Sequence, residues 1–168
     1  MEQELICVDI ETSTWFDQPH IKPLPRELQI AAMELGCAVT WDNTREGSSF
    51  WYNNEFDILT LPDDIMSFEA WEDTDTHHLW DYLKSFEIII GWNIISFDLP
   101  IIARADGATI GAKFPQIFDL FAIIKQVTGR WYKLQDVAYA NLGRGKTADG
   151  LQAAKWLAQG EFLKAVVS

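Results

Sequence analysis

Two carboxylates stand close together near the N-terminus, where the run LICVDIET (Leu5–Thr12) ends. In a strand, Asp9 and Glu11 project from the same face about 6.6 Å apart, because side chains alternate between the two faces. Ionised carboxylates repel each other where solvation is poor, and the first 20 residues contain no Lys or Arg to neutralise them. A divalent cation would satisfy both, and such oxygen donors favour Mg²⁺ or Mn²⁺ over zinc. Alternatively, the strand surfaces after Val8 and water solvates both acids.

A second candidate segment is GWNIISFDLPII (Gly91–Ile102), which leaves an apolar strand and enters a helix. Pro100 is favoured in the first turn of a helix, so the side chain of Asp98 is well placed to cap it. A cap does not explain why Asn93 lies five residues upstream, in the turn between strand and helix. Ligands of open α/β sheets gather at such strand ends, which makes this turn a candidate site.

Together these two segments resemble the first two motifs of the DEDD superfamily of 3′–5′ exonucleases, the DnaQ-like enzymes. The first family motif is Asp-x-Glu at the end of the first strand, and the second is an Asn, a few residues, then Phe-Asp opening a helix. The resemblance implies an α/β, ribonuclease H-like fold, with a mixed central sheet of a three-strand antiparallel meander plus parallel strands, flanked by helices. It also implies metal-dependent hydrolysis of phosphodiester bonds from the 3′ end of single-stranded DNA or RNA.

The resemblance assigns roles residue by residue. Three acids would be the catalytic metal ligands for Mg²⁺ or Mn²⁺, in a two-metal mechanism if a fourth carboxylate is supplied: Asp9, Glu11 and Asp98. Three further residues would lie on the substrate side of the cleft: Thr12, Asn93 and Phe97. Asp119, in a segment that resembles a helix of this family, is expected to cap a helix or support the site rather than bind metal.

The stretch GRWYKLQDVAYANLGRGK (residues 129–146) mixes basic with aromatic residues, as surfaces that track a nucleic-acid backbone and stack its bases do. We therefore expect substrate contacts from three cations: Arg130, Lys133 and Lys146. Residues 104–168 hold nine basic and five acidic residues, whereas residues 1–103 hold four basic and 20 acidic ones, so the C-terminal third could form one edge that attracts a polyanion; the asymmetry alone decides nothing. Trp131 and Tyr132 either stack on bases or belong to the core.

The family pattern is incomplete, because its fourth acid, an Asp four or five residues after a Tyr or His, is missing. The tail Gln159–Ser168 looks like the run before that motif, so we expect a chain truncated before its last catalytic helix, with a further domain or partner beyond Ser168. One alternative is a catalytically incomplete ribonuclease H-like module that binds nucleic acid or protein. A second is a structure-specific endonuclease, which would use the same acids.

Composition sets broader bounds. A chain of 168 residues with 48% hydrophobic and 23% charged residues is typical of one globular domain. Its longest apolar run, Ile88–Ile95, is too short to cross a bilayer, and MEQEL lacks the basic start of a secretory signal. The two cysteines, Cys7 and Cys37, form no CxxC pair, so we expect reduced thiols and a cytoplasmic protein.

Hydrophobic patterning predicts the elements that position these residues. Strands are expected at Leu5–Ile10, Gln29–Trp41, Ser48–Asn53 and Glu87–Trp92, with a proline-rich loop over residues 17–27. A helix at Thr76–Ser85 should bury Leu79, Trp80 and Leu83. From Asp98 onward the pattern is mostly helical, at residues 99–105, 119–127, 134–142, 150–158 and 162–167.

Overall fold

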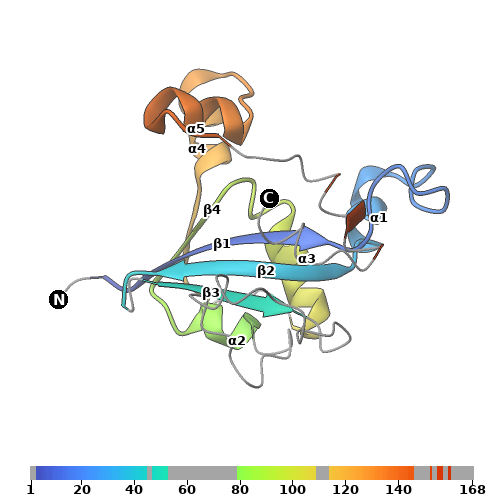
Figure 1. Ribbon diagram of the computed structural model, residues 1–168, viewed down its shortest axis with the longest axis horizontal. Coiled ribbons are helices and arrows are strands. Elements are labelled where there is room, and N and C mark those ends of the chain that lie inside the picture. The colour runs from blue at the N-terminus through green and yellow to red at the C-terminus, as the bar shows by residue number, and fades with distance from the viewer. Residues whose placement is uncertain are drawn as a thin grey trace.

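The computed structural model describes residues 3–44, 47–52, 79–108 and 114–145, together with residues 152, 155, 156 and 159. These residues form an α/β arrangement in which helices flank a five-stranded sheet of order β3-β2-β1-β4-β5 (Figure 1). The sheet is mixed, as expected from the sequence. No helix among the described residues is long and apolar enough to cross a membrane.

The strands confirm the predicted meander. They are β1 (Leu5–Thr12), β2 (Leu35–Asp42), β3 (Gly47–Tyr52), β4 (Ile88–Gly91) and β5 (Gln116–Asp119). β1 pairs with β2, and β2 with β3, in antiparallel register. β4 joins the other edge of β1 in parallel and β5 pairs with β4 in parallel, which brings the C-terminal ends of β1, β4 and β5 to one side.

The helices are α1 (Arg26–Ala31), α2 (Leu79–Lys84), α3 (Asp98–Ala105), α4 (Leu120–Thr128) and α5 (Leu134–Leu142). α2 and α3 pack their apolar side chains on one face of the sheet and form the core with β1. The predicted stripe of α2, Leu79, Trp80 and Leu83, is buried there, as expected.

One element prediction is wrong at its start, and one element was missed. Gln29 belongs to α1 rather than to a strand over Gln29–Trp41, because the peptide carbonyl of Pro25 accepts the first helical hydrogen bond from the Gln29 N–H at 2.9 Å. β5 was not predicted, because it is four residues long and buries only Asp119, which is too little for a periodic pattern. The predicted helix over residues 162–167 lies outside the described residues.

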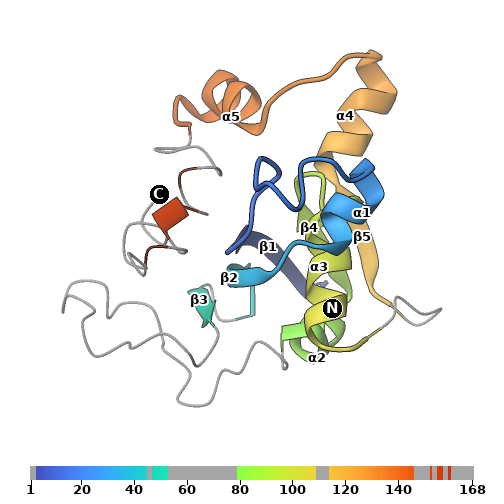
Figure 2. The same ribbon diagram turned by 90° about the vertical axis from the view of Figure 1, so that its right-hand side faces the viewer.

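α4 and α5 differ from the other helices in their position. They leave the end of β5 and rise away from the sheet as an arm, which we define as residues 120–145 (Figures 1 and 2). None of the residues of α4 or α5 is buried. The arm therefore contributes little to the core, and its side chains are available for contacts elsewhere.

Candidate carboxylate and aromatic site

β1 separates its side chains between core and cavity. Ile6, Val8 and Ile10 point into the core, whereas Asp9 is exposed and Glu11 partly buried on the opposite face. The predicted common face of Asp9 and Glu11 is therefore confirmed. Both residues line a cavity of about 600 Å³, a volume typical of small-ligand sites. The register between β1 and β2 shifts directly after Glu11, an irregularity that often re-aims side chains beside functional sites.

Asp98 reaches the same cavity from α3. The residue at the N-cap position of α3 is Phe97 and no side chain caps the helix, so the predicted capping role of Asp98 is wrong. Asp98 is the first helical residue and is buried, and its Oδ1 accepts a hydrogen bond of 3.3 Å from the backbone N–H of Ile10. Because Ile10 lies between Asp9 and Glu11 in the sequence, this bond ties the carboxylate of Asp98 to the part of β1 that carries the other two acids. All three acids line the cavity.

The turn between β4 and α3 requires two unusual residues. A Cβ at Gly91 would lie 2.7 Å from Cδ1 of Ile94, so only glycine lets the turn fold this closely onto the end of β4. Asn93 has a φ of 59°, in the left-handed region that asparagine tolerates better than most residues. This sharp turn brings Asn93, Phe97 and Asp98 to one side of the cavity.

Asp119 braces that turn. Its buried carboxylate caps α4 by accepting a hydrogen bond of 3.1 Å from the N–H of Ala122. It also accepts hydrogen bonds from the N–H groups of Asn93, at 3.0 Å, and Ile95, at 3.2 Å. The predicted role of Asp119 as a helix cap is confirmed, and the structure adds that the same side chain holds the turn that leads to Asp98.

Aromatic side chains form two groups around the cavity. On one side, the rings of Phe16 and Phe97 lie 6.1 Å apart, and the guanidinium of Arg26 lies 3.6 Å from the centroid of Phe16. On the other side, the ring centroid of Phe121 lies 5.7 Å from that of Trp92 and 5.0 Å from that of Trp131, and both pairs are arranged edge to face. Five of these six side chains, all except Arg26, line the cavity.

Sequence reasoning missed Phe16, Trp92 and Phe121 as cavity residues. The signal was present for the first two, since Phe16 follows the DIET motif closely and Trp92 precedes Asn93. Aromatic residues next to the polar ends of strands could have been predicted to line a cavity. Phe121 gave no such signal, because it reaches the cavity only through the position of the arm.

The predicted substrate-binding residues divide into two groups. Thr12, Asn93 and Phe97 all line the cavity. The hydroxyl of Thr12 donates a hydrogen bond of 2.6 Å to the carbonyl of Thr14, which orders the chain after β1. Arg130 and Lys133 are exposed on the arm and do not line the cavity, and Lys146 lies outside the described residues.

The acids fit a hard cation by type but do not form a finished metal site. Among the described residues, no three His, Cys, Asp or Glu side chains are grouped so as to hold a metal ion. Asp9, Glu11 and Asp98 thus share a cavity wall without forming a ready cage. Cys37, paired with Glu11 across the sheet, adds no soft ligand: burial, reinforced by the charges of Glu11 and Asp9, raises the pKa of its thiol to about 12.

No model of a known protein family matches the chain, and no curated protein matches it in sequence.

Proposed function

We propose that this chain is a metal-dependent 3′–5′ exonuclease of the ribonuclease H-like fold that hydrolyses single-stranded DNA or RNA. One observation carries the proposal: acids from β1 and α3, nearly ninety positions apart, line one cavity, and Asp98 accepts a hydrogen bond from the N–H of Ile10, the residue between Asp9 and Glu11 in the sequence. The elements follow the order of the family that the chain resembles: a three-strand meander, then a parallel strand that leads to the helix carrying Asp98.

The metal ligands in this proposal are Asp9, Glu11 and Asp98, with Mg²⁺ or Mn²⁺ as the ion. When bound, the ion would supply a water of lowered pKa and a positive charge beside the phosphate. Because the three acids do not already form a group, we expect binding to require side-chain movement. Without a cation, the same acids repel a phosphate, so cleavage should stop when a chelator is added.

The other cavity residues would orient the substrate. Phe16 and Phe97 offer a base an apolar surface next to the acids, as aromatic residues do in single-strand binding sites. The hydrogen bond from Thr12 to Thr14 shapes the chain between Glu11 and Phe16. Asn93 lies at the same end, where its amide has both a donor and an acceptor for a sugar or phosphate.

A labelled single strand tests the proposal. With Mn²⁺, wild type should shorten a 5′-labelled oligonucleotide stepwise from its 3′ end, and a circular single strand should resist. Asp9→Asn should abolish both cleavage and Mn²⁺ binding, the latter measured by electron paramagnetic resonance. Glu87→Gln is the matched control, because Glu87 is exposed and does not line the cavity. Undiminished cleavage by Asp9→Asn, or cleavage in excess chelator, would refute the proposal, and cleavage of the circle would indicate an endonuclease.

A second candidate is a catalytically incomplete module of the same fold. The absence of a ready three-ligand group among the described residues favours it. Such a module would bind Mn²⁺ weakly or not at all and still bind a single strand. Binding of the oligonucleotide without any shortening, over a range of Mn²⁺ concentrations, would support this alternative over the exonuclease.

A further inference from the structure

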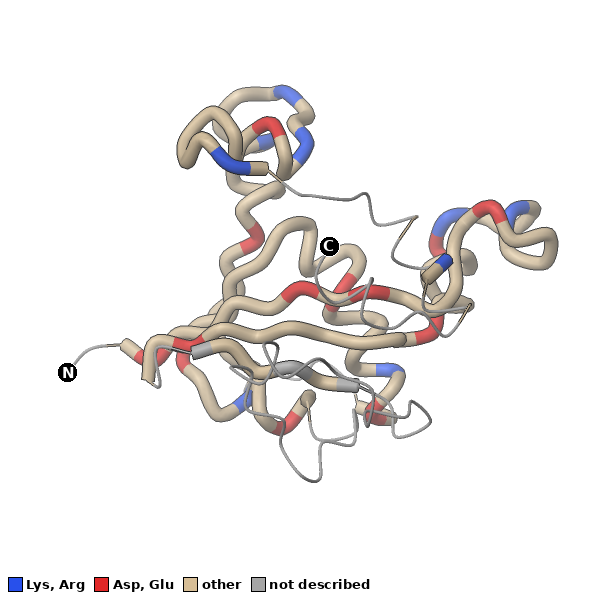
Figure 3. Tube along the Cα trace, in the orientation of Figure 1, with Lys and Arg blue, Asp and Glu red and all other residues tan. Residues whose placement is uncertain are grey.

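The arm concentrates positive charge on an acidic protein. Residues 120–145 contain four basic residues, all exposed, against one acidic residue, Asp136. The basic residues are Lys125, Arg130, Lys133 and Arg144. Figure 3 shows these cations gathered around α4 and α5, above a sheet whose charged residues are mainly acidic. A polyanion would therefore be drawn to the arm rather than to the body of the molecule.

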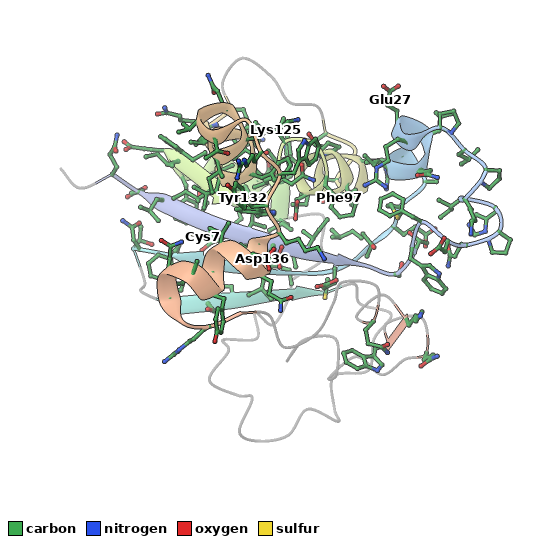
Figure 4. All side chains as sticks on the ribbon, turned by 90° about the horizontal axis from the view of Figure 1, so that it is seen from above. Cys7, Glu27, Phe97, Lys125, Tyr132 and Asp136 are labelled. Carbon is green, nitrogen blue, oxygen red and sulfur yellow. The ribbon has the colours of Figure 1, made fainter. Side chains whose placement is uncertain are left out.

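Trp131 lies in the segment between α4 and α5, and its side chain is held in place although it is exposed. The residue is 71% exposed, yet it lines the cavity together with Asp9 and Glu11. The edge-to-face contact with Phe121 fixes the ring from one side. Nζ of Lys125 lies 3.9 Å from the ring centroid, a cation–π contact. Lys125 and Tyr132, which follows Trp131, are labelled in Figure 4, which looks down on the arm.

Burial does not explain why so large an apolar ring is held at this place. An exposed aromatic residue in a fixed orientation is typical of a binding surface. A nucleic-acid base stacks well on the face of an indole ring, and the ammonium group over the other face supplies a positive charge for the phosphate of the same strand. An internal base of a duplex is already stacked on both sides, so an indole competes for it only when the strand is single.

We propose that Trp131 and Lys125 form a nucleotide-binding site on the arm side of the cavity, at which a base of a single strand stacks on Trp131 and its phosphate contacts Lys125. This inference rests on the proposed function, because it assumes that the strand runs from the arm to the acids. Arg130 and Lys133 would then contact the phosphates further along. The two aromatic groups of the cavity would hold successive parts of one strand, with Phe16 and Phe97 nearer to α1.

Binding without catalysis tests the site. Fluorescence anisotropy of a labelled oligothymidylate is measured in EDTA with the full chain, so that cleavage plays no part. Trp131→Ala should weaken binding about 5- to 150-fold, the loss typical of one stacked base, and Trp131→Phe should restore most of it. Lys125→Gln should weaken binding less and reduce its dependence on salt. Trp41→Ala is the matched control, since Trp41 is also exposed but does not line the cavity.

The possible outcomes separate this site from the proposed function. Equal affinity of Trp131→Ala and wild type, equal affinity for duplex and single strand, or no binding by wild type would each overturn the site. An oligonucleotide with abasic positions should bind as weakly to wild type as the normal one binds to Trp131→Ala, and tight binding would also overturn it. Because all of these affinities are measured in EDTA, where metal-dependent cleavage plays no part, a failure of the exonuclease proposal leaves this result intact.

Discussion

α3 and α4 are two versions of the same unit. Each follows a short parallel strand, β4 or β5, and each has an aspartate at the junction. α3 buries five of its eight residues, whereas α4 buries none of its nine. The aspartates differ too: Asp119 caps its own helix, whereas Asp98 accepts its hydrogen bond from the neighbouring strand β1.

The two aspartates bond differently because Asp119 occupies the N-cap position of its helix, whereas Asp98 occupies the next position, the first helical one. At the N-cap, a carboxylate can reach the free N–H groups of its own first turn, as Asp119 does. At the first helical position, the side chain of Asp98 instead accepts a hydrogen bond from the N–H of Ile10 in β1. α3 is therefore a buried helix that positions Asp98 at the cavity. α4 begins the exposed arm, and its capping residue Asp119 also holds the turn that precedes α3.

The largest expected effect comes from Asp98→Asn. The asparagine keeps an oxygen that can accept the hydrogen bond from Ile10 but loses the charge that a metal ion needs. We expect cleavage to fall by at least about 100-fold, as when a group that stabilises transition-state charge is removed, with the free energy of unfolding changed by less than about 1 kcal/mol. Single-turnover cleavage and urea denaturation measure the two. A large loss of stability with normal cleavage would show that Asp98 is structural, like Asp119.

Asp119→Ala should show the opposite pattern. It leaves the N–H groups of Asn93, Ile95 and Ala122 without this acceptor, and the loss of a cap together with two further hydrogen bonds to a charged group costs about 2–4 kcal/mol of unfolding free energy. Asp119→Asn retains one acceptor oxygen, so we expect a smaller loss. Urea denaturation monitored by circular dichroism measures both variants. Equal stability of Asp119→Ala and wild type would mean that the turn does not depend on the brace.

The thiol of Cys37 senses the two cavity acids that come from β1, Glu11 and Asp9. Burial first, then the charge of Glu11, raises the pKa of its thiol from the ordinary 9.0 to about 12. Because the pKa is higher in the folded state, the stabilising effect is fully present below pH 9 and is lost as the pH rises towards 12, by about 1.4 kcal/mol per unit.

Unfolding in chelator at pH 8 and pH 10 measures this loss as the difference between wild type and Cys37→Ala. Cys37→Ala should lose about 1.4 kcal/mol less than wild type over this interval. Asp98→Asn should leave the wild-type loss unchanged, because Asp98 is not among the groups that raise the pKa of Cys37. If Cys37→Ala lost as much stability as wild type, the thiol of Cys37 would not be the group responsible for the loss.

The sequence predicted what depends on local pattern. The alternation along β1 placed Asp9 and Glu11 on one face, and the apolar stripe located α2. It did not predict the contact from Asp98 to Ile10, because a shift of one position between cap and first helical residue is decided by packing against β1. The aromatic contacts of Phe121 were also beyond reach, since they join segments that are neighbours only in the folded chain.

The smallest effect is expected at Asn93, in the turn between β4 and α3 that Asp119 holds. Asn93→Ala should cost about 1 kcal/mol of unfolding free energy, because alanine is strained at a φ of 59°, whereas Asn93→Gly should fold at least as stably as wild type. Neither variant has the amide, so the pair separates backbone from side chain. If both variants cleave equally poorly, the amide of Asn93 contacts the substrate. If glycine restores cleavage and alanine does not, Asn93 serves only to shape the turn that brings Asp98 beside Ile10.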